Sequence, residues 1–233
     1  MTDYIPKQPA MRRIKNFRKN ILAWFSTEGR DFPWRHAGEP IYRIIISEVL
    51  LQRTKATTVA NIYFNFFKKY SSWNKLAAAT VEDLEEFLRP LGLWRRRAIS
   101  LLNLARVVVQ RNGHLPQTRS EIEELPGVGQ YIANAIELMC GINAAPLLDV
   151  NMVRVLERYF GPRTMADIRY DPYLQKLAWR VVDCDFSIQL SWAILDLAAM
   201  VCIAREPRCK GCPLSYGCNF VRNVSIASGM SQS

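Results

Sequence analysis

The 233-residue chain is basic: 31 Lys and Arg against 21 Asp and Glu give a formal net charge of +10. An apolar fraction of 49% argues against disorder, and no apolar run reaches the length of a membrane span, so a membrane protein is not expected. A soluble chain this basic usually has a polyanion among its partners, although charge alone also fits a merely basic surface.

Apolar residues recur with a helical period along most of the chain, and strand-like alternation is absent. Residues 10–26 have a basic amphipathic pattern, whereas 41–54 is apolar nearly all round, as in a buried helix. We therefore predict an all-α protein. Its expected helices cover 10–26, 41–54, 59–70, 80–89, 95–111, 118–125, 130–139, 150–160, a segment starting at 172, and 187–204.

Short polar motifs mark several helix starts. Thr80 with Asp83, and Thr118 with Glu121, have the spacing of capping boxes. The pair Asp171-Pro172 puts an N-cap residue before a proline at the first helical position, where proline is well tolerated. These signals predict where three of the helices begin.

A tight turn is expected at Pro126 to Gly129, between two helices. Glycine supplies backbone angles that other residues avoid, and small residues let a phosphate approach the main chain. The unpaired N–H groups at the start of the next helix are anion donors. Gly127, Val128 and Gly129 are therefore candidate phosphate-binding residues, and an ordinary helix connection is the alternative.

Four of the six cysteines lie in one tail segment: Cys202, Cys209, Cys212 and Cys218. Such crowding indicates a metal site rather than a disulfide framework, and the N-terminus shows no secretory signal, so we expect a reducing, cytoplasmic location. Four thiolates can hold Zn²⁺ or a [4Fe-4S] cluster, and the spacing leans modestly toward iron–sulfur. Arg205, Arg208 and Lys210 lie within this loop, where they could face phosphates or simply be solvated.

Two carboxylates stand out. Glu48 is surrounded by apolar residues in the 41–54 segment, so it is either partly buried and suited to proton transfer, or on the one wet face of its helix. Asp149 directly precedes a helix and is a natural N-cap. The helix dipole would keep Asp149 ionised, and an ionised carboxylate beside a cleft would stabilise a positively charged sugar intermediate.

The glycine hairpin at 125–129, the Asp about twenty residues later and the four-cysteine spacing together resemble the helix-hairpin-helix DNA glycosylases of the endonuclease III superfamily. The resemblance covers nearly the whole chain. It implies a two-lobed all-α fold, with a six-helix barrel lobe over 30–145 and a second lobe formed by 1–29 and 146–233. The second lobe would carry a [4Fe-4S] cluster on the four cysteines. The implied partner is double-stranded DNA containing a mismatched or damaged base, bound by a monomer.

Within this superfamily, bifunctional enzymes carry a lysine two residues after the hairpin, whose amine attacks the sugar. This chain has Tyr131 there, so the resemblance implies a monofunctional glycosylase. The segment from Ser47 to Thr54 is similar to the helix of MutY-type adenine glycosylases in which a glutamate assists base departure. MutY-type enzymes usually have serine where Tyr131 stands. The resemblance therefore implies Asp149, Tyr131 and Glu48 as catalytic residues.

The sequence is most similar to archaeal thymine-DNA mismatch glycosylases, which share a segment like Asp31 to His36 and a run like Val153 to Gly161. Those enzymes remove thymine or uracil opposite guanine from a flipped nucleotide. The alternatives are an adenine glycosylase of the MutY type, a non-catalytic DNA-binding protein and a zinc-bearing DNA-binding protein. The expected DNA contacts are Gly127, Val128, Gly129, Gln52, Arg53, Trp94, Arg95, Arg96, Arg97, Arg208 and Lys210.

Overall fold

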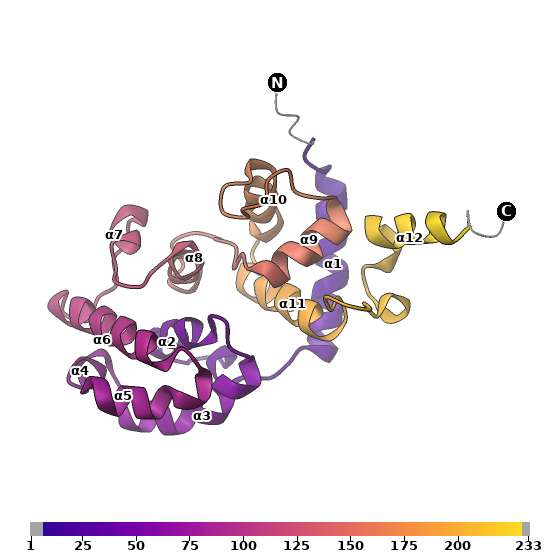
Figure 1. The fold of residues 1–233 in the computed structure, drawn as a ribbon. Coiled ribbons are helices and arrows are strands. Elements are labelled where there is room, and N and C mark those ends of the chain that lie inside the picture. Colours follow the sequence, from indigo (N-terminus) through magenta and orange to yellow (C-terminus); the bar gives the residue numbers. More distant parts are fainter. Residues whose placement is uncertain (1–6, 230–233) are drawn as a thin grey trace. The chain divides into compact units, whose positions relative to one another are not determined.

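The computed structural model describes residues 7–229, of which 225–229 are described by their backbone alone, and it contains helices but no strand over this range. The prediction of an all-α protein is confirmed for the described part of the chain. The chain divides into two compact units, Asp31–Ile142 and Met1–Arg30 with Asn143–Ser233, whose helices are drawn in Figure 1. Among the described residues, no helix combines the length and apolar character that crossing a membrane requires.

In the unit of residues 31–142, helix α6 lies against α4 and α5, while α2 lies against α3 and α8. The predicted apolar period of α3 buries Tyr63, Phe66 and Phe67 in the core of this unit. The helices are α2 (Ile41–Leu51), α3 (Ala56–Lys69), α4 (Trp73–Ala77), α5 (Val81–Leu88), α6 (Trp94–Gln110), α7 (Arg119–Glu123) and α8 (Gln130–Met139).

In the other unit, α11 is the apolar centre and lies against both α1 and α9. Asp196, fully buried in α11, forms an ion pair of 2.7 Å with Arg30, which follows the end of α1. Helix α10 contacts α1 and α11, and α12 contacts α9. The helices are α1 (Met11–Glu28), α9 (Val150–Phe160), α10 (Pro172–Val182), α11 (Ser187–Met200) and α12 (Asn219–Gly229).

Helix α2 ends three residues earlier than predicted, at Leu51, because Arg53 has a left-handed backbone with φ of +57°. Helix α11 ends at Met200 rather than at 204, and the chain then turns into the cysteine loop. The sequence pattern did not indicate α4 or α12. Helix α4 is short and packs on α6, and α12 packs on α9, so neither needs a strong apolar period of its own to form.

Two predicted capping boxes have different outcomes. Thr80 accepts a hydrogen bond from the backbone N–H of Asp83 over 3.1 Å, as predicted. The Thr118 hydroxyl instead donates to the Glu121 carboxylate over 2.7 Å, and no backbone N–H is capped by its side chain. The prediction for Thr118 is confirmed in part. Thr118 is the N-cap residue of α7, and the Glu121 carboxylate accepts from its backbone N–H, as in a capping box, as well as from Arg111 over 3.0 Å. The bond from the Thr118 side chain to a backbone N–H is missing.

Candidate functional site

The turn between α7 and α8 is the expected glycine hairpin. Gly127 has φ of +75°, and a Cβ added there would lie 3.1 Å from Cβ of Ser100 in α6. Glycine is thus required both by the backbone and by the neighbouring helix. Gly129 is the N-cap residue of α8 and brings no side chain to cap its first N–H groups. Gly127 and Gly129 are exposed and Val128 is half-buried, so the main chain of the hairpin is open to an anion.

Arg119 fastens the two helices of the hairpin together. Its guanidinium donates to the carboxylate of Glu123 within α7, and to Asn134 and Glu137 in α8, each over 2.6–2.7 Å. Glu137 is only 3% exposed, so this charge-assisted bond lies in a partly desolvated setting. The clamp fixes α7 against α8 and thereby the path of the turn between them.

Glu48 and Tyr131 meet where α2 lies against α8. Glu48 is 2% exposed, which confirms that it is buried rather than on a wet helix face. The Tyr131 hydroxyl, in the first turn of α8, donates a hydrogen bond to Oε2 of Glu48 over 2.9 Å. A buried acid and a half-buried phenol therefore share one polar contact two residues beyond the hairpin.

The turn before α6 exposes Leu93 rather than Trp94, the residue that was predicted to contact DNA. Trp94 is half-buried, with the guanidinium of Arg95 at 4.3 Å and that of Arg89 at 5.5 Å from its ring centre. Leu93 is instead 59% exposed and has φ of +50°. Sequence reasoning missed Leu93. The signal was an apolar residue directly after Gly92, at a helix start where no core face requires it.

The three consecutive arginines at the start of α6 differ in exposure and in the groups that they contact. Arg95 and Arg96 are exposed, and Arg95 stacks on Trp94. Arg97 is only 7% exposed and donates to main-chain carbonyls. The expectation that Arg97 contacts the DNA backbone is therefore wrong, because its side chain lies within the core of the unit.

Asp149 caps α9, as predicted. One carboxylate oxygen, Oδ1, accepts hydrogen bonds from the backbone N–H groups of Asn151 (2.9 Å) and Met152 (2.8 Å). The other, Oδ2, accepts from the Asn151 side-chain amide over 2.6 Å. The carboxylate is half-buried and lies at the positive end of the helix dipole. Sequence reasoning assigned no role to Asn151.

A chain of hydrogen bonds runs from Asp149 to the cysteine loop within the same unit. The Oδ1 atom of Asn151 accepts from the Arg154 guanidinium over 3.2 Å. Arg154 in turn donates to the main-chain oxygens of Cys202 (2.8 Å) and Ala198 (2.9 Å). The side chain that orients Asp149 is thus held by a residue that also fixes the start of the cysteine loop.

The four thiols of the loop lie close enough together to influence one another. Burial raises the pKa of Cys212 to about 11; a backbone hydrogen bond at Leu214 opposes this, and the charges of the other three cysteines add to it. Arg158 of α9 donates to Sγ of Cys202 over 3.3 Å, and the Cys218 thiol donates to the Arg158 carbonyl over 3.2 Å. Within residues 7–224, no three His, Cys, Asp or Glu side chains are placed to hold a single metal ion.

That arrangement still suits a multinuclear cluster in its donor chemistry. In a [4Fe-4S] cluster each thiolate binds a different iron, so the four sulfurs need not converge on one point. The loop offers four free thiols, Cys202, Cys209, Cys212 and Cys218, which are the donor type and number that such a cluster needs. Arg208 and Lys210 are exposed between the cysteines, as a surface facing an anion requires.

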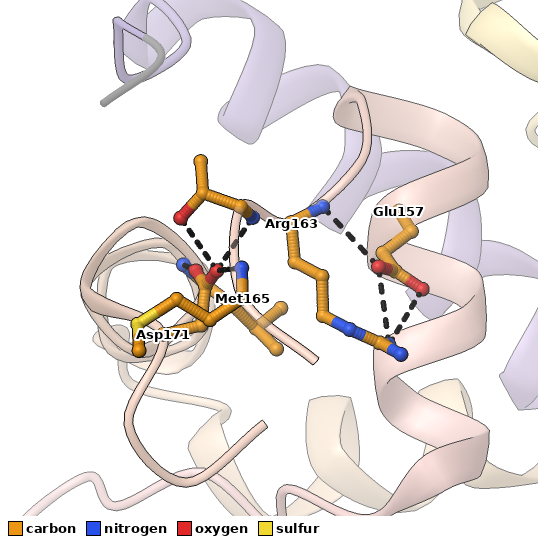
Figure 2. Close-up of polar contacts among 6 residues, drawn as sticks. Glu157, Arg163, Met165 and Asp171 are labelled. Atoms are coloured by element: carbon orange, nitrogen blue, oxygen red, sulfur yellow. Dashed lines mark hydrogen bonds and ion pairs between the residues drawn. The ribbon is translucent and has the colours of Figure 1, made fainter. Parts of the chain in front are cut away.

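The loop that follows α9 is anchored at two points, shown in Figure 2. Arg163 donates to the Glu157 carboxylate over 3.2 Å. Asp171 is fully buried and accepts hydrogen bonds from Thr164 and from the backbone N–H of Met165. These bonds fix the segment between α9 and α10, and so support the helix that carries Asp149 at its start.

Comparison with known proteins places this geometry among repair enzymes. Residues 46–178 match the model of a family described as HhH-GPD superfamily base excision DNA repair protein. The chain is 36% identical to the thymine-DNA glycosylase of Aeropyrum pernix, over 91% of this chain and 96% of that protein. It is 35% identical to a thymine/uracil-DNA glycosylase of Methanothermobacter thermautotrophicus, over 92% and 97% respectively. A solved structure of a thermostable thymine-DNA glycosylase is similar with a TM-score of 0.83 and 34% identity, over 91% of this chain and 98% of that one.

Proposed function

The chain belongs to the HhH-GPD superfamily of base excision DNA repair proteins, and we propose that it is a monofunctional glycosylase for thymine or uracil opposite guanine. As a DNA glycosylase it hydrolyses the N-glycosidic bond between a base and its sugar. The observation that carries the monofunctional assignment is the phenol of Tyr131 in the first turn of α8, beside Glu48, to which it donates a hydrogen bond. Because a phenol stands where an attacking amine would be needed, no Schiff base forms there.

Asp149 supplies the catalytic charge in this proposal. Its carboxylate is held by two backbone N–H groups and by Asn151, at the positive end of α9. An ionised, pre-oriented carboxylate stabilises the positive charge that develops on the sugar as the base departs, and it orients the attacking water. Tyr131 and Glu48 face the flipped base or its sugar, with Glu48 assisting departure of the base.

DNA binding follows from the open main chain and the exposed turns. The N–H groups of Gly127, Val128 and Gly129 bind a phosphate near the target, and Arg208 and Lys210 bind others. Flipping the nucleotide out of the duplex costs the least free energy at a mismatch, and it leaves a gap in the base stack. The remaining contacts fill that gap and touch the orphaned base: Gln52, Arg53, Leu93 and Trp94.

The cysteine loop is proposed to hold a [4Fe-4S] cluster. Cys202, Cys209, Cys212 and Cys218 would bind it, and when bound it would cross-link the loop and stiffen the surface of Arg208 and Lys210. We also assign residues 30–145 to a six-helix barrel lobe, and residues 1–29 with 146–233 to the cluster lobe. We propose that the protein is a monomer and acts on DNA inside the cell. Purified protein should be yellow-brown, with iron and acid-labile sulfide. Colourless protein containing zinc would replace this assignment with a zinc site.

The function is tested by excision of single bases from labelled duplexes, measured in one turnover with enzyme in excess. The substrates are T·G, U·G, A·G, A·8-oxoguanine and matched controls, each with and without alkali. Cleavage of T·G and U·G that appears only after alkali supports the proposal. Preference for adenine would favour a MutY-type adenine glycosylase with Glu48 as the leading acid. Tight binding without excision of any base would favour a non-catalytic binding protein.

A further inference from the structure

Arg97 is a buried cation whose N–H groups are all used. A guanidinium has five N–H donors in a rigid fork. No carboxylate in the described part of the chain forms an ion pair with it. Its acceptors are the main-chain oxygens of Val49 (3.0 Å), Leu50 (3.1 Å), Gln52 (2.8 Å) and Gly92 (3.4 Å), and Oγ1 of Thr54 (2.9 Å).

These acceptors belong to two turns of the chain that are about forty residues apart in sequence. One set lies in the last turn of α2 and in the segment 52–54 that follows it, where helix carbonyls lack partners within the helix. The other lies in the segment 91–93 before α6. The Thr54 hydroxyl donates to the carbonyl of Leu91 over 3.2 Å, which joins the two turns directly. Arg97 and Thr54 therefore hold both turns in one hydrogen-bonded network.

Each turn carries one exposed residue in a left-handed backbone conformation. Arg53 has φ of +57° and Leu93 has φ of +50°. This conformation costs free energy for any residue with a Cβ, and it persists only where the surrounding structure holds it. Both side chains belong to the set proposed to fill the gap left by a flipped nucleotide. The strained positions therefore coincide with the residues that would enter the duplex.

We propose that Arg97 is a positioning residue, which holds the 52–54 and 91–93 turns at one spacing so that Arg53 and Leu93 enter the DNA together. This inference rests on the proposed function. Lysine cannot replace Arg97 in this role, because an ammonium has three donors and no planar fork and so cannot serve both turns. An apolar side chain would fill the volume but leave buried carbonyls without donors. The cation thus links two parts of the proposed DNA-reading surface, together with the Thr54 hydroxyl that it also binds.

The test compares Arg97→Lys and Arg97→Met with the parent on two uracil substrates at saturating enzyme. The first is U·G, where the gap must be filled. The second places uracil opposite an abasic site, where no partner base has to be displaced. We expect both variants to lose about 100-fold in single-turnover rate on U·G, because Arg53 and Leu93 would be misplaced in the duplex. The loss on the abasic substrate should be much smaller.

Two control variants separate positioning from folding and from charge. Leu104→Ala removes a buried side chain seven residues beyond Arg97 in α6, and it should lower the melting temperature with equal effects on both substrates. Arg96→Met removes the exposed neighbouring charge, and it should weaken DNA binding equally for both. Equal losses on the two substrates for Arg97→Lys, or parental rates on both, would overturn the proposal.

Failure of the proposed base specificity has its own signature. If the parent removes uracil from neither substrate, the proposed base specificity is wrong. The role of Arg97 is then tested by nucleotide flipping, without base excision. 2-Aminopurine next to a T·G mismatch becomes brighter when its neighbour is flipped. Parental protein should brighten it, Arg97→Lys should do so far less, and equal brightening by both would overturn the role of Arg97.

Discussion

The side-chain amide of Asn151 donates a hydrogen bond of 2.6 Å to Oδ2 of Asp149, the oxygen that the backbone of α9 leaves uncapped. Oδ1 is bound by backbone N–H groups that any residue except proline at position 151 would retain. Oδ2 depends on this one side chain and on the Arg154 guanidinium that holds it. Asn151 therefore sets the direction of the carboxylate without being needed for the helix cap.

Replacing Asn151 with alanine should leave α9 capped and the melting temperature nearly unchanged. The single-turnover excision rate should fall by up to about 100-fold, because the carboxylate is no longer fixed relative to the sugar. DNA affinity, measured by fluorescence anisotropy, should stay at the parental value. An unchanged excision rate would show that Asp149 needs no orientation by this amide.

Replacing Tyr131 with lysine should introduce an amine at the position of the phenol and allow a Schiff base with the sugar. Borohydride should then trap a covalent protein–DNA complex on gels, which the parent should not form. Tyr131→Phe is the matched control, since it removes the bond to Glu48 without adding an amine. A lysine variant that binds DNA normally but is never trapped would place residue 131 out of reach of the sugar.

Gly127→Ala should be more damaging than alanine at another left-handed glycine. Gly113 has φ of +82° and no atom near its virtual Cβ, whereas Gly127 has φ of +75° and the Ser100 contact. Both changes should cost about 1–2 kcal/mol of unfolding free energy from the backbone alone. Gly127→Ala should cost more in chemical denaturation and should also weaken DNA binding. Equal effects of the two variants on affinity would argue against phosphate binding by the hairpin.

Asp171 should make folding sensitive to acid. Burial tends to raise the pKa of this carboxyl, but hydrogen bonds from Leu174, Thr164 and Met165 outweigh it and hold the pKa below the ordinary 3.8. Its stabilisation is thus fully present above pH 3.8 and is lost as the pH falls through the lower folded pKa. Asp171→Ala should lose roughly 1–2 kcal/mol at neutral pH through the missing cap. Its melting temperature should also fall less than the parental one between about pH 5 and pH 2, and parallel curves would contradict this role.

Local signals predicted the parts of the site that depend on nearby residues. The glycine hairpin and the Asp149 cap are set within a few residues, so their patterns identify them. Arg95, Arg96 and Arg97 are chemically identical in sequence, and only tertiary packing makes the third a buried clamp. One signal was available: Arg97 lies in helical register with Leu101, Leu104 and Val108, which are all buried.

Contacts between distant segments could not be predicted in the same way. Leu93 is exposed in a left-handed turn, while the Arg95 guanidinium lies over the neighbouring Trp94 ring, and the sequence of the turn does not show which of the two apolar side chains is the exposed one. The link from Asn151 through Arg154 to Cys202 joins α9 to a carbonyl 48 positions away from Arg154. Both required the folded arrangement of helices within one unit.

The most direct test of the account is single-turnover excision of uracil from a U·G duplex by the parent and by Asp149→Asn. Asparagine caps helices as well as aspartate, so the variant should fold and bind DNA normally. The account predicts that the parent leaves an intact abasic site, cleaved only after alkali, and that Asp149→Asn shows no excision above the control without enzyme. Undiminished excision by Asp149→Asn, or strand breaks by the parent without alkali, would contradict it.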